Sequence, residues 1–525
     1  MQTSNSFPKG VFPPSPGGST SEVTQQFRSY QLRQKRILLK RTVQFWWYPI
    51  LFVMLGGVVA ATLGQFALDL PKVVIGLTFG IPLIYLAIRF PTVGLLLAAI
   101  CVSPFMPSAL KVSTVYISPA IPLILLIFFL VWVRTGFSGR KPILPSLWTT
   151  WPLFGLIFMA ILSELLAQAT WLIVVPRQVL GNPIVFEEGI GVAMYFAPLI
   201  VVYTVSAILT GKDRWIQYIL HTFLILALFD AAILLVEFKH IGADIYTFRY
   251  TSPSIGWMPL EALAQLLALG CMIAYAYFLN ATRWLGRIMY GLAFVICLMA
   301  LYFSLENSWW FEAAIALAVI TLAYSRRLFV FFCIAALPFL PLVRSFVQKL
   351  QSVKSVDALR FIIWQDMLHV WSKRPVFGVG PGNLWAYDQV FTHLPPGVRN
   401  FAKSGLGVAH NGYLQTLGEL GPLGLFFHIA CLVVLIIAAV RLIRRSRSIT
   451  TPEIRNDRIL GLAGLGLVCG SMAADLVASY FFLPPRQSLH VASLPQALVS
   501  WIIYGCILYK DQLWRMACKG IRVEN

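Results

Sequence analysis

The sequence predicts an all-α, polytopic integral membrane protein with about 14 transmembrane helices, within a range of about 11 to 14. Of the 525 residues, 58% are hydrophobic and only 12% are charged. In a soluble globular protein, about a quarter of the residues are charged. Apolar runs close to the length of a bilayer span recur along the chain, and 14% of the residues are aromatic, as is typical of chains that meet membrane interfaces. These observations exclude a soluble globular domain.

Each predicted span is an apolar run that approaches the ~20 residues needed to cross the hydrocarbon core. The second, third and eleventh runs are short, so we expect them to be tilted or re-entrant. The spans are predicted at 45–64, 72–88, 91–107, 114–133, 149–168, 187–207, 216–236, 259–280, 288–305, 308–325, 328–343, 422–441, 459–480 and 494–509.

Basic residues predict the orientation of these spans. Arg and Lys are frequent in every second segment between spans, for example at 134–141 and 441–447, and are scarcer in the segments that alternate with them. The positive-inside rule therefore places both the N-terminus and the C-terminus in the cytoplasm. The same rule accounts for the net charge of +20 without a nucleic-acid partner.

Five regions follow from this topology. Residues 1–41 are rich in Pro, Gly and Ser and then in Arg and Lys, which predicts a disordered, basic cytoplasmic tail. Residues 42–343 are predicted to form an N-terminal transmembrane bundle, and 344–421 a long extracytoplasmic loop near the C-terminus. Residues 422–509 supply the C-terminal transmembrane helices, and 510–525 form a basic cytoplasmic tail.

The first part of the long loop is predicted to be an amphipathic helix on the outer membrane surface. Apolar residues at 359, 362, 363, 367 and 370 have helical spacing, and Trp364 and Trp371 are one heptad apart. Arg360, four residues before Trp364, falls on or beside the apolar face. Two interpretations of Arg360 stay open: it reaches lipid headgroups, or it binds a lipid phosphate.

A glycine-rich turn follows, with the sequence PVFGVGPGN at 375–383. Gly378, Gly380 and Gly382 permit positive φ angles, so the chain is expected to turn sharply. A P-loop is excluded, because Asn383 and Leu384 stand where Lys and Ser or Thr would be needed. The glycines are expected to let the backbone approach either a packed helix or a substrate.

The last part of the loop, GVAHNGYLQTLGELGPLG at 407–424, contains a candidate general base. His410 and Asn411 precede a short predicted helix, which meets Gly421 and Pro422 before a full span begins. This places His410 at the boundary between membrane and water, where a side chain with a pKa near neutrality suits general-base catalysis. A purely structural histidine is the alternative. No spacing of His, Cys or acidic residues predicts a metal site.

The run from Arg360 to Gly424 resembles the C-terminal signature of the O-antigen ligase and O-antigen polymerase superfamily of bacterial membrane glycosyltransferases. The shared features are an Arg with a Trp four residues later, then P-x-x-G-x-G-x-G-x, then His-Asn before a Leu-rich turn into a span. The spacing of His410, Asn411, Gly421 and Gly424 matches the ligase pattern.

This resemblance implies a multi-pass protein of the bacterial inner membrane that moves or polymerises glycans in surface or exopolysaccharide biosynthesis. The donor would be a glycan linked to undecaprenyl diphosphate, and the acceptor a hydroxyl of a glycan or lipid on the outer face. The resemblance implies neither a cofactor nor a metal. Besides donor, acceptor and lipid bilayer, other polysaccharide-assembly proteins are candidate partners.

The resemblance also implies roles for particular residues. His410 would be the base or orient the acceptor, and Arg360 and Arg249 would bind and neutralise the diphosphate. The candidate substrate-binding residues are Asn411, Trp364, Gly378, Gly380, Gly382, Asn383 and Arg399.

Acidic residues within or at the ends of predicted spans keep a second function open. Acids inside a membrane often mark ion or proton pathways. They favour a secondary transporter or flippase for a polysaccharide precursor or a small anion, although hydrogen bonding between helices would also explain them. These residues are Glu164, Asp230, Glu261, Glu312 and Asp475.

Overall fold

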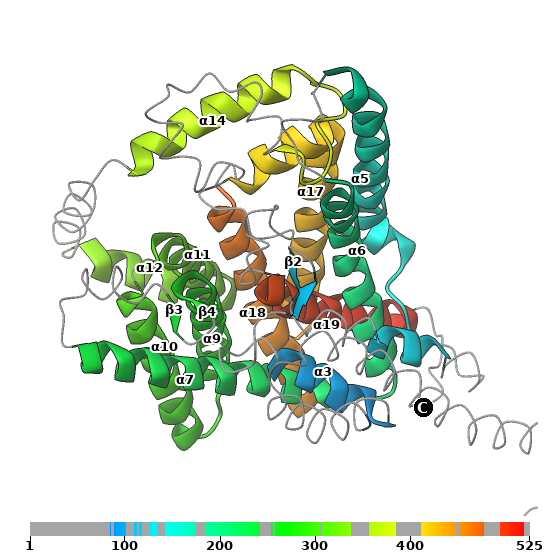
Figure 1. Ribbon diagram of the computed structural model, residues 1–525. Coiled ribbons are helices and arrows are strands. Elements are labelled where there is room, and N and C mark those ends of the chain that lie inside the picture. The colour runs from blue at the N-terminus through cyan, green and yellow to red at the C-terminus, as the bar shows by residue number, and fades with distance from the viewer. Residues whose placement is uncertain are drawn as a thin grey trace, which may run out of the picture. The chain divides into compact units, whose positions relative to one another are not determined.

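A computed structural model of the chain describes a helical protein (Figure 1). The chain divides into two units, Met1–Tyr85 and Leu86–Asn525, and the helices and strands below all lie in the second. The described residues are 85, 89–100, 110–112, 115–117, 126–133, 142–174, 184–241, 254–255, 258–304, 306–337, 356–384, 411–446, 451–476 and 494–518. The predicted N-terminal tail and the first two predicted spans lie outside them, apart from the tyrosine at position 85.

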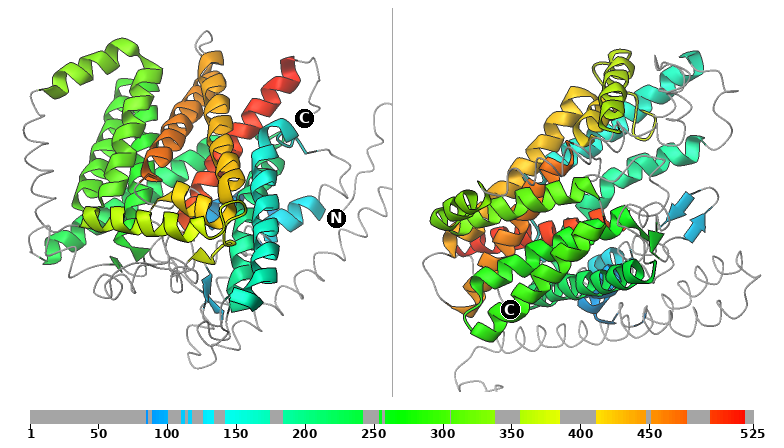
Figure 2. Two further views of the ribbon diagram at one scale, coloured as in Figure 1. Left: turned by 90° about the horizontal axis from the view of Figure 1, so that it is seen from above. Right: turned by 90° about the vertical axis from the view of Figure 1, so that its left-hand side faces the viewer.

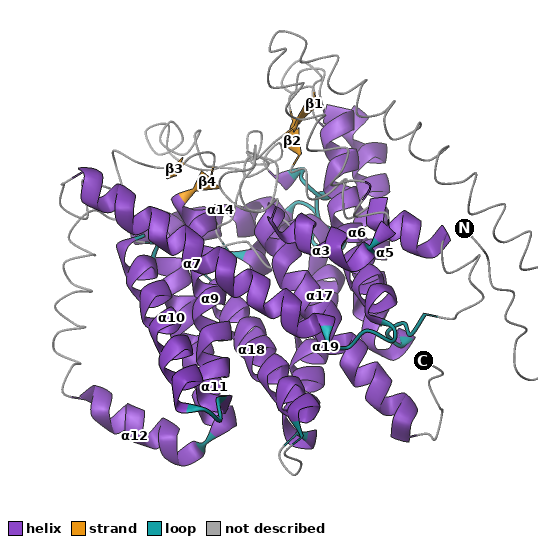
Figure 3. Ribbon diagram, turned by 90° about the horizontal axis from the view of Figure 1, so that it is seen from below, coloured by secondary structure: helices purple, strands orange, loops and turns teal. Residues whose placement is uncertain are grey.

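Helices make up nearly all of the described residues, which confirms the predicted helical class (Figure 3). Two short antiparallel strand pairs accompany them: β1 (Leu110–Val112) with β2 (Val115–Ile117), and β3 (Ser254–Ile255) with β4 (Met258–Pro259). The helices are α3 (Pro91–Ile100), α5 (Leu147–Val174), α6 (Ile184–Leu209), α7 (Trp215–Ile241), α9 (Leu260–Asn280), α10 (Trp284–Phe303), α11 (Asn307–Tyr324), α12 (Arg326–Ala336), α14 (Val356–Ser372), α17 (Gly412–Arg445), α18 (Pro452–Ala474) and α19 (Leu494–Cys518).

Helix α18 joins two groups of helices. It packs against α9 and α11, which form one group with α7 and α10, and against α17 and α19, which form a second group with α5 and α6 (Figures 1 and 2). Glycines on α18 make this close packing feasible. A Cβ atom at Gly464 would lie 2.0 Å from Cδ1 of Ile507 on α19, and one at Gly466 would lie 2.6 Å from Cδ1 of Ile320 on α11.

The distribution of apolar side chains is that of a membrane protein. In the most apolar stretch of α9, 83% of the residues are buried, whereas in that of α10 only 22% are. The outer face of α10 exposes Ile288, Met289, Leu292 and Val295, an apolar surface too extensive for a water-soluble exterior. In a bilayer, the same face contacts lipid.

Six helices of the described part of the chain are long and apolar enough to cross a membrane. Two shorter apolar helices, Tyr195–Leu209 and Ser308–Tyr324, accompany them. The predicted total of about 14 spans is not confirmed by these residues and stays a prediction. The six are Leu147–Ala167, Trp215–Phe238, Leu263–Asn280, Trp284–Phe303, Gly412–Arg445 and Glu453–Ala474.

One predicted span begins too early. The helix expected at 114–133 cannot start at 114, because Val115–Ile117 form β2, whose register pairs Val112 with Val115 and Leu110 with Ile117. Helical residues follow only at 126–133. Valine, tyrosine and isoleucine at 115–117 suit a strand, and a hydropathy criterion does not separate an apolar strand from an apolar helix.

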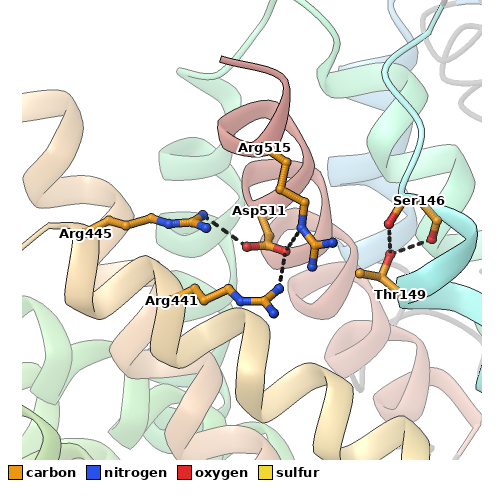
Figure 4. A network of polar contacts seen from close by, with 6 residues as sticks. All are labelled: Ser146, Thr149, Arg441, Arg445, Asp511 and Arg515. Atoms are coloured by element: carbon orange, nitrogen blue, oxygen red, sulfur yellow. Dashed lines mark hydrogen bonds and ion pairs between the residues drawn. The ribbon is translucent and has the colours of Figure 1, made fainter. Parts of the chain in front are cut away.

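A buried carboxylate holds the C-terminal ends of α17 and α19 together (Figure 4). Asp511 accepts hydrogen bonds from Arg441 at 3.3 Å, from Arg445 at 3.1 Å and from Arg515 at 2.8 Å. The side chain of Asp511 is 1% exposed, whereas those of the three arginines are 21–40% exposed. The guanidinium group of Arg445 also stacks 4.0 Å above the ring of Trp514.

Lys510 forms a second ionic contact at the same end of α19. Its ammonium group lies 2.7 Å from Oδ2 of Asp213 and 3.1 Å from Oδ1 of Asp457, so it links α19 to the turn before α7 and to α18. Burial lowers the pKa of Lys510, but the two carboxylates outweigh this effect and raise its pKa above the ordinary value. Lys510 is therefore charged at neutral pH.

The Asp511 contact predicts a destabilised Asp511→Asn protein. The substitution leaves three guanidinium groups without their shared charge. The expected loss of unfolding free energy is about 1 to 3 kcal/mol, below the value for fully buried pairs because water reaches the arginines. Arg515→Gln is the matched control, since it leaves two arginines on Asp511 and should cost less. Thermal unfolding in detergent measures both, and equal midpoints for the two variants would contradict the assignment.

Candidate functional site

The N-terminal end of α17 is fixed by the side chain of Asn411. Its Oδ1 accepts hydrogen bonds from the backbone N–H groups of Tyr413 at 3.1 Å and Leu414 at 3.0 Å, which is the geometry of a helix N-cap. Its side-chain amide donates to the carbonyl of Leu476 at 3.0 Å, just beyond the end of α18. The Asn predicted to bind substrate therefore has a structural role.

The same end of α17 is docked on the end of α18. The backbone N–H of Gly412 donates to the carbonyl oxygen of Asp475 at 2.7 Å, and the hydroxyl of Tyr413 donates to the carbonyl of Met472 at 2.9 Å. A Cβ atom at Gly412 would lie 2.6 Å from the carboxyl carbon of Asp475, so a larger residue would displace this carboxylate. The hydrogen bonds of Asn411, Gly412 and Tyr413 therefore fix the start of α17 against the end of α18.

A short helix at the start of α17 ends at Gly421, before the membrane span begins. Gly421 has φ 72° and ψ −174°, which is not helical, and Pro422 follows. The predicted short helix, its end at Gly421 and the span after it are all present. From Gly421 to Arg444 the chain rises about 35 Å, enough to cross a hydrocarbon core of about 30 Å.

The glycine-rich turn caps the C-terminal end of this short helix. The N–H of Val379 donates to the carbonyl of Gly418 at 2.9 Å, and the N–H of Gly380 donates to that of Glu419 at 3.0 Å. The hydroxyl of Ser163 on α5 donates to the same Glu419 carbonyl at 2.7 Å. Helix ends leave carbonyl groups without partners, and here the turn and α5 supply them.

The three glycines of the turn adopt the predicted positive φ angles, but only two make close contacts. Gly378 (φ 74°) lies so near the short helix that a Cβ atom would be 2.4 Å from the backbone of Glu419. A Cβ atom at Gly380 (φ 95°) would be 2.7 Å from Oε2 of Glu164. Nothing lies within 4 Å of that position at Gly382 (φ 76°). Close packing against a helix explains the glycines at two of these positions: Gly378 lies against the short helix and Gly380 against α5. Gly382 has open space beside it.

Two buried carboxylates lie around this junction. Glu419, 3% exposed, accepts hydrogen bonds from Gln415 on the same helix and from the hydroxyl of Tyr195 on α6 at 3.2 Å. Glu164 on α5, 6% exposed, accepts one from the side-chain amide of Asn383 at 3.0 Å. Placing an ionisable group away from water at membrane depth costs free energy. These two carboxyl groups therefore serve either the function of the protein or the positioning of its helices.

A second buried polar cluster lies between α17 and α18. His428 Nε2 is 3.4 Å from Oδ2 of Asp475, and His428 Nδ1 is 2.9 Å from the hydroxyl of Thr416. His428 and Asp475 are each 1% exposed. Thr416 belongs to the short helix and His428 to the span after it, so these contacts brace the two parts of α17 across the kink.

This second cluster continues to a small polar cavity. Asp475 lines the cavity with Glu312 of α11 and Ser471 of α18, and the hydroxyl of Ser471 donates to Glu312 at 3.2 Å. The cavity has room for about one water molecule. Oε2 of Glu312 has no hydrogen-bond partner among the described residues. A water in this cavity would satisfy it.

The structure brings together some of the predicted site residues. Gly378 and Gly380 contact the short helix that Asn411 begins, and the side chain of Asn383 binds Glu164 on α5. These contacts position the residues and do not test whether they bind substrate. His410, Arg249 and Arg399 lie outside the described residues. Within the described residues, no group of three His, Cys, Asp or Glu side chains is placed to hold a metal ion.

The predicted amphipathic helix corresponds to α14, which packs against α17. Its buried face is formed by Ile363, Asp366, Met367 and Val370, while Ile362, expected on that face, is 37% exposed. Trp364 is half-buried, and its ring centroid lies 5.1 Å from that of Phe361. The backbone of Arg360 lies in α14, one helical turn before Trp364, and its side chain is outside the described part.

Several residues at this junction were not predicted from the sequence. Glu419, Gln415, Tyr195 and His428 were not among the candidates. Gln415 and Glu419 stand four residues apart on a helix, which is a local pattern for a hydrogen bond. Tyr195 and His428 carry no such local indication, because their partners come from other helices or from beyond the kink.

The fold and the site define a class of protein: a helical membrane protein in which a glycine-rich turn and a short helix form a rigid polar junction before a span. Residues 292–429 match the family model for O-antigen ligase. The match runs from the middle of α10 to Ile429 in α17 and includes α14, the glycine-rich turn and the short helix. The match covers about a quarter of the chain, and it supports the membership of the O-antigen ligase superfamily that the sequence signature predicts. No curated protein matches the chain.

The contact between turn and short helix predicts different effects for two glycine substitutions. Both Gly378→Ala and Gly382→Ala place a side chain at positive φ, which costs about 1 to 2 kcal/mol. Only Gly378→Ala also forces a methyl group onto the backbone of Glu419. Gly378→Ala should therefore lower the yield of monodisperse protein and its unfolding midpoint much more than the matched Gly382→Ala. Equal losses would show that the close approach is unimportant.

Proposed function

We propose that this protein transfers glycans from an undecaprenyl-diphosphate carrier to an acceptor hydroxyl on the outer face of the bacterial inner membrane. The match of residues 292–429 to the O-antigen ligase family carries the proposal. The family match indicates an integral membrane protein that functions in glycan transfer. The donor, the acceptor, the membrane face and the choice between ligation and polymerisation belong to the proposal.

The arrangement of the junction supports an interfacial reaction. A polyprenyl carrier keeps its tail in the bilayer, so its diphosphate must react at the boundary with water. The rigid junction lies at the end of the α17 span, and α14 packs against α17 beside it. A site fixed by buried hydrogen bonds costs little reorganisation during the reaction.

In this proposal, His410 is the base that accepts the proton of the acceptor hydroxyl. It directly precedes Asn411, whose side chain is bonded to the ends of both α17 and α18. Arg360, Arg249 and Arg399 bind the diphosphate and neutralise the charge that develops on the leaving group. Trp364, Gly382 and Asn411 contribute to the wall of the substrate site.

The transporter or flippase interpretation has no support from the family match. Buried acids motivated it, and several of them have partners in the structure. Glu164 accepts from Asn383, Glu312 accepts from Ser471, and Asp475 lies beside His428. Asp230 differs, because neither of its carboxylate oxygens has a hydrogen-bond partner among the described residues.

His410→Ala is expected to abolish glycan transfer in proteoliposomes that contain a polyprenyl-diphosphate-linked oligosaccharide. Loss of a general base lowers the turnover rate by about 10²- to 10⁴-fold. Products are read by gel electrophoresis and mass spectrometry. A ladder of longer lipid-linked glycans identifies a polymerase, and transfer to a different acceptor identifies a ligase.

His393→Ala serves as the matched control, because it removes a second histidine from the same predicted loop and should keep its activity. Wild-type turnover by a folded His410→Ala protein would refute the role of His410. Ion-coupled flux without any glycan product would refute glycan transfer itself.

Arg360→Ala is expected to weaken donor use and leave the fold intact. Loss of a charge-assisted hydrogen bond to a phosphate costs about 1.5 to 3 kcal/mol, or roughly one to two orders of magnitude in kcat/KM. Arg360→Lys should recover part of this loss, because it restores the charge without the bidentate geometry. If Arg283→Ala, an exposed arginine of the α10 N-cap, lowered kcat/KM equally, a specific diphosphate contact would be ruled out.

A further inference from the structure

A groove lies at the end of the α17 span that is opposite the glycine-rich turn. It is formed by the C-terminal ends of α11 and α17, the first residue of α12 and the middle of α18, and its volume is about 380 Å³. Five of its lining residues are apolar: Leu322, Ala323, Val440, Ile443 and Leu465. Leu322 is 46% exposed, so the groove opens on the outside of the bundle, where a membrane protein meets lipid.

Two arginines line the same groove. Arg326 begins α12 and Arg444 lies in the last turn of α17, and both are exposed. Neither forms an ion pair with a carboxylate within the described residues. The N-terminal end of α12 adds the positive end of a helix dipole beside Arg326. The groove therefore combines apolar walls with two arginines that have no carboxylate partner in the described part of the chain.

The helical spacing of α17 explains why Arg444 is not neutralised. Arg441 and Arg445 are four residues apart, so they share one face of the helix and both bind Asp511 on α19. Arg444 follows Val440 by four residues, and these two face the groove together. One face of the helix end is thus used for internal packing, and the other presents a guanidinium group to the groove.

Helix α12 shows independently that this region contacts lipid. Of the described elements, α11 is the one that α12 packs against extensively, and α12 exposes Val330, Phe331, Phe332 and Ile334. Such a surface is stable in the acyl-chain region and not in water. An apolar helix that starts with two arginines places its charged end at headgroup depth.

We propose that this groove binds an anionic glycerophospholipid. The phosphate lies between the guanidinium groups of Arg326 and Arg444, and an acyl chain lies along Leu322, Val440 and Leu465. Basic pockets between transmembrane helices recognise anionic headgroups by this combination of charge and apolar surface. The site is separate from the proposed glycan-transfer site, because it lies a full span away along α17.

The test is a titration of the purified full-length chain with phosphatidylglycerol, followed by native mass spectrometry that counts bound lipids. The probe variant is the double substitution Arg326→Gln and Arg444→Gln. The matched control is Arg327→Gln with Arg283→Gln, which removes the same charge from exposed residues that do not line the groove. The probe variant should lose about tenfold or more in apparent affinity, and the control should stay within about twofold of wild type.

Two comparisons separate the lipid from other sources of phosphate. Phosphatidylcholine should bind at least about tenfold more weakly than phosphatidylglycerol, since its headgroup has no net charge. Inorganic phosphate at the same concentration should neither bind measurably nor displace the lipid. Equal losses in probe and control, equal binding of the two lipids, or displacement by inorganic phosphate would each overturn the proposal.

Discussion

The junction of this protein depends on the hydrogen bonds that end the short helix before the α17 span. At membrane depth a backbone carbonyl without a partner is costly, so a helix that stops at Gly421 needs donors from elsewhere. The N–H groups of Val379 and Gly380 and the hydroxyl of Ser163 provide them. The glycine-rich turn and the short helix belong to two separate parts of the sequence signature, and they are therefore the two sides of one contact.

The local features of this junction were predictable from the sequence, and its partners were not. Positive φ at Gly378, Gly380 and Gly382 follows from glycine spacing, and the break at Gly421 follows from a Gly-Pro pair before a span. By contrast, Asn383 bonds to a residue 219 positions away, and Tyr195 to one 224 positions away. A single sequence contains no information on such pairs, because many residues have equally suitable chemistry.

Hydropathy also has a definite limit in this chain. Hydropathy located the helices of the described part to within a few residues at most ends, because burial in lipid and burial in protein both select apolar side chains. For the same reason it missed β2 and could not distinguish an acid on a transport path from one that braces two helices. Glu164, Glu312 and Asp475 have the same sequence context in either case, and only their partners separate the two interpretations.

The ionic contacts at the end of α19 have a consequence for how the chain inserts. Lys510, Arg441, Arg445 and Arg515 face the carboxylates of Asp213, Asp457 and Asp511, so three carboxylates offset most of the charge of these four cations in the folded protein. Acidic residues hardly influence orientation during insertion, when these helices have not yet met. The positive-inside rule therefore predicts that the same cations act twice: first they hold the helix ends on one side of the membrane, and later they join those ends to one another.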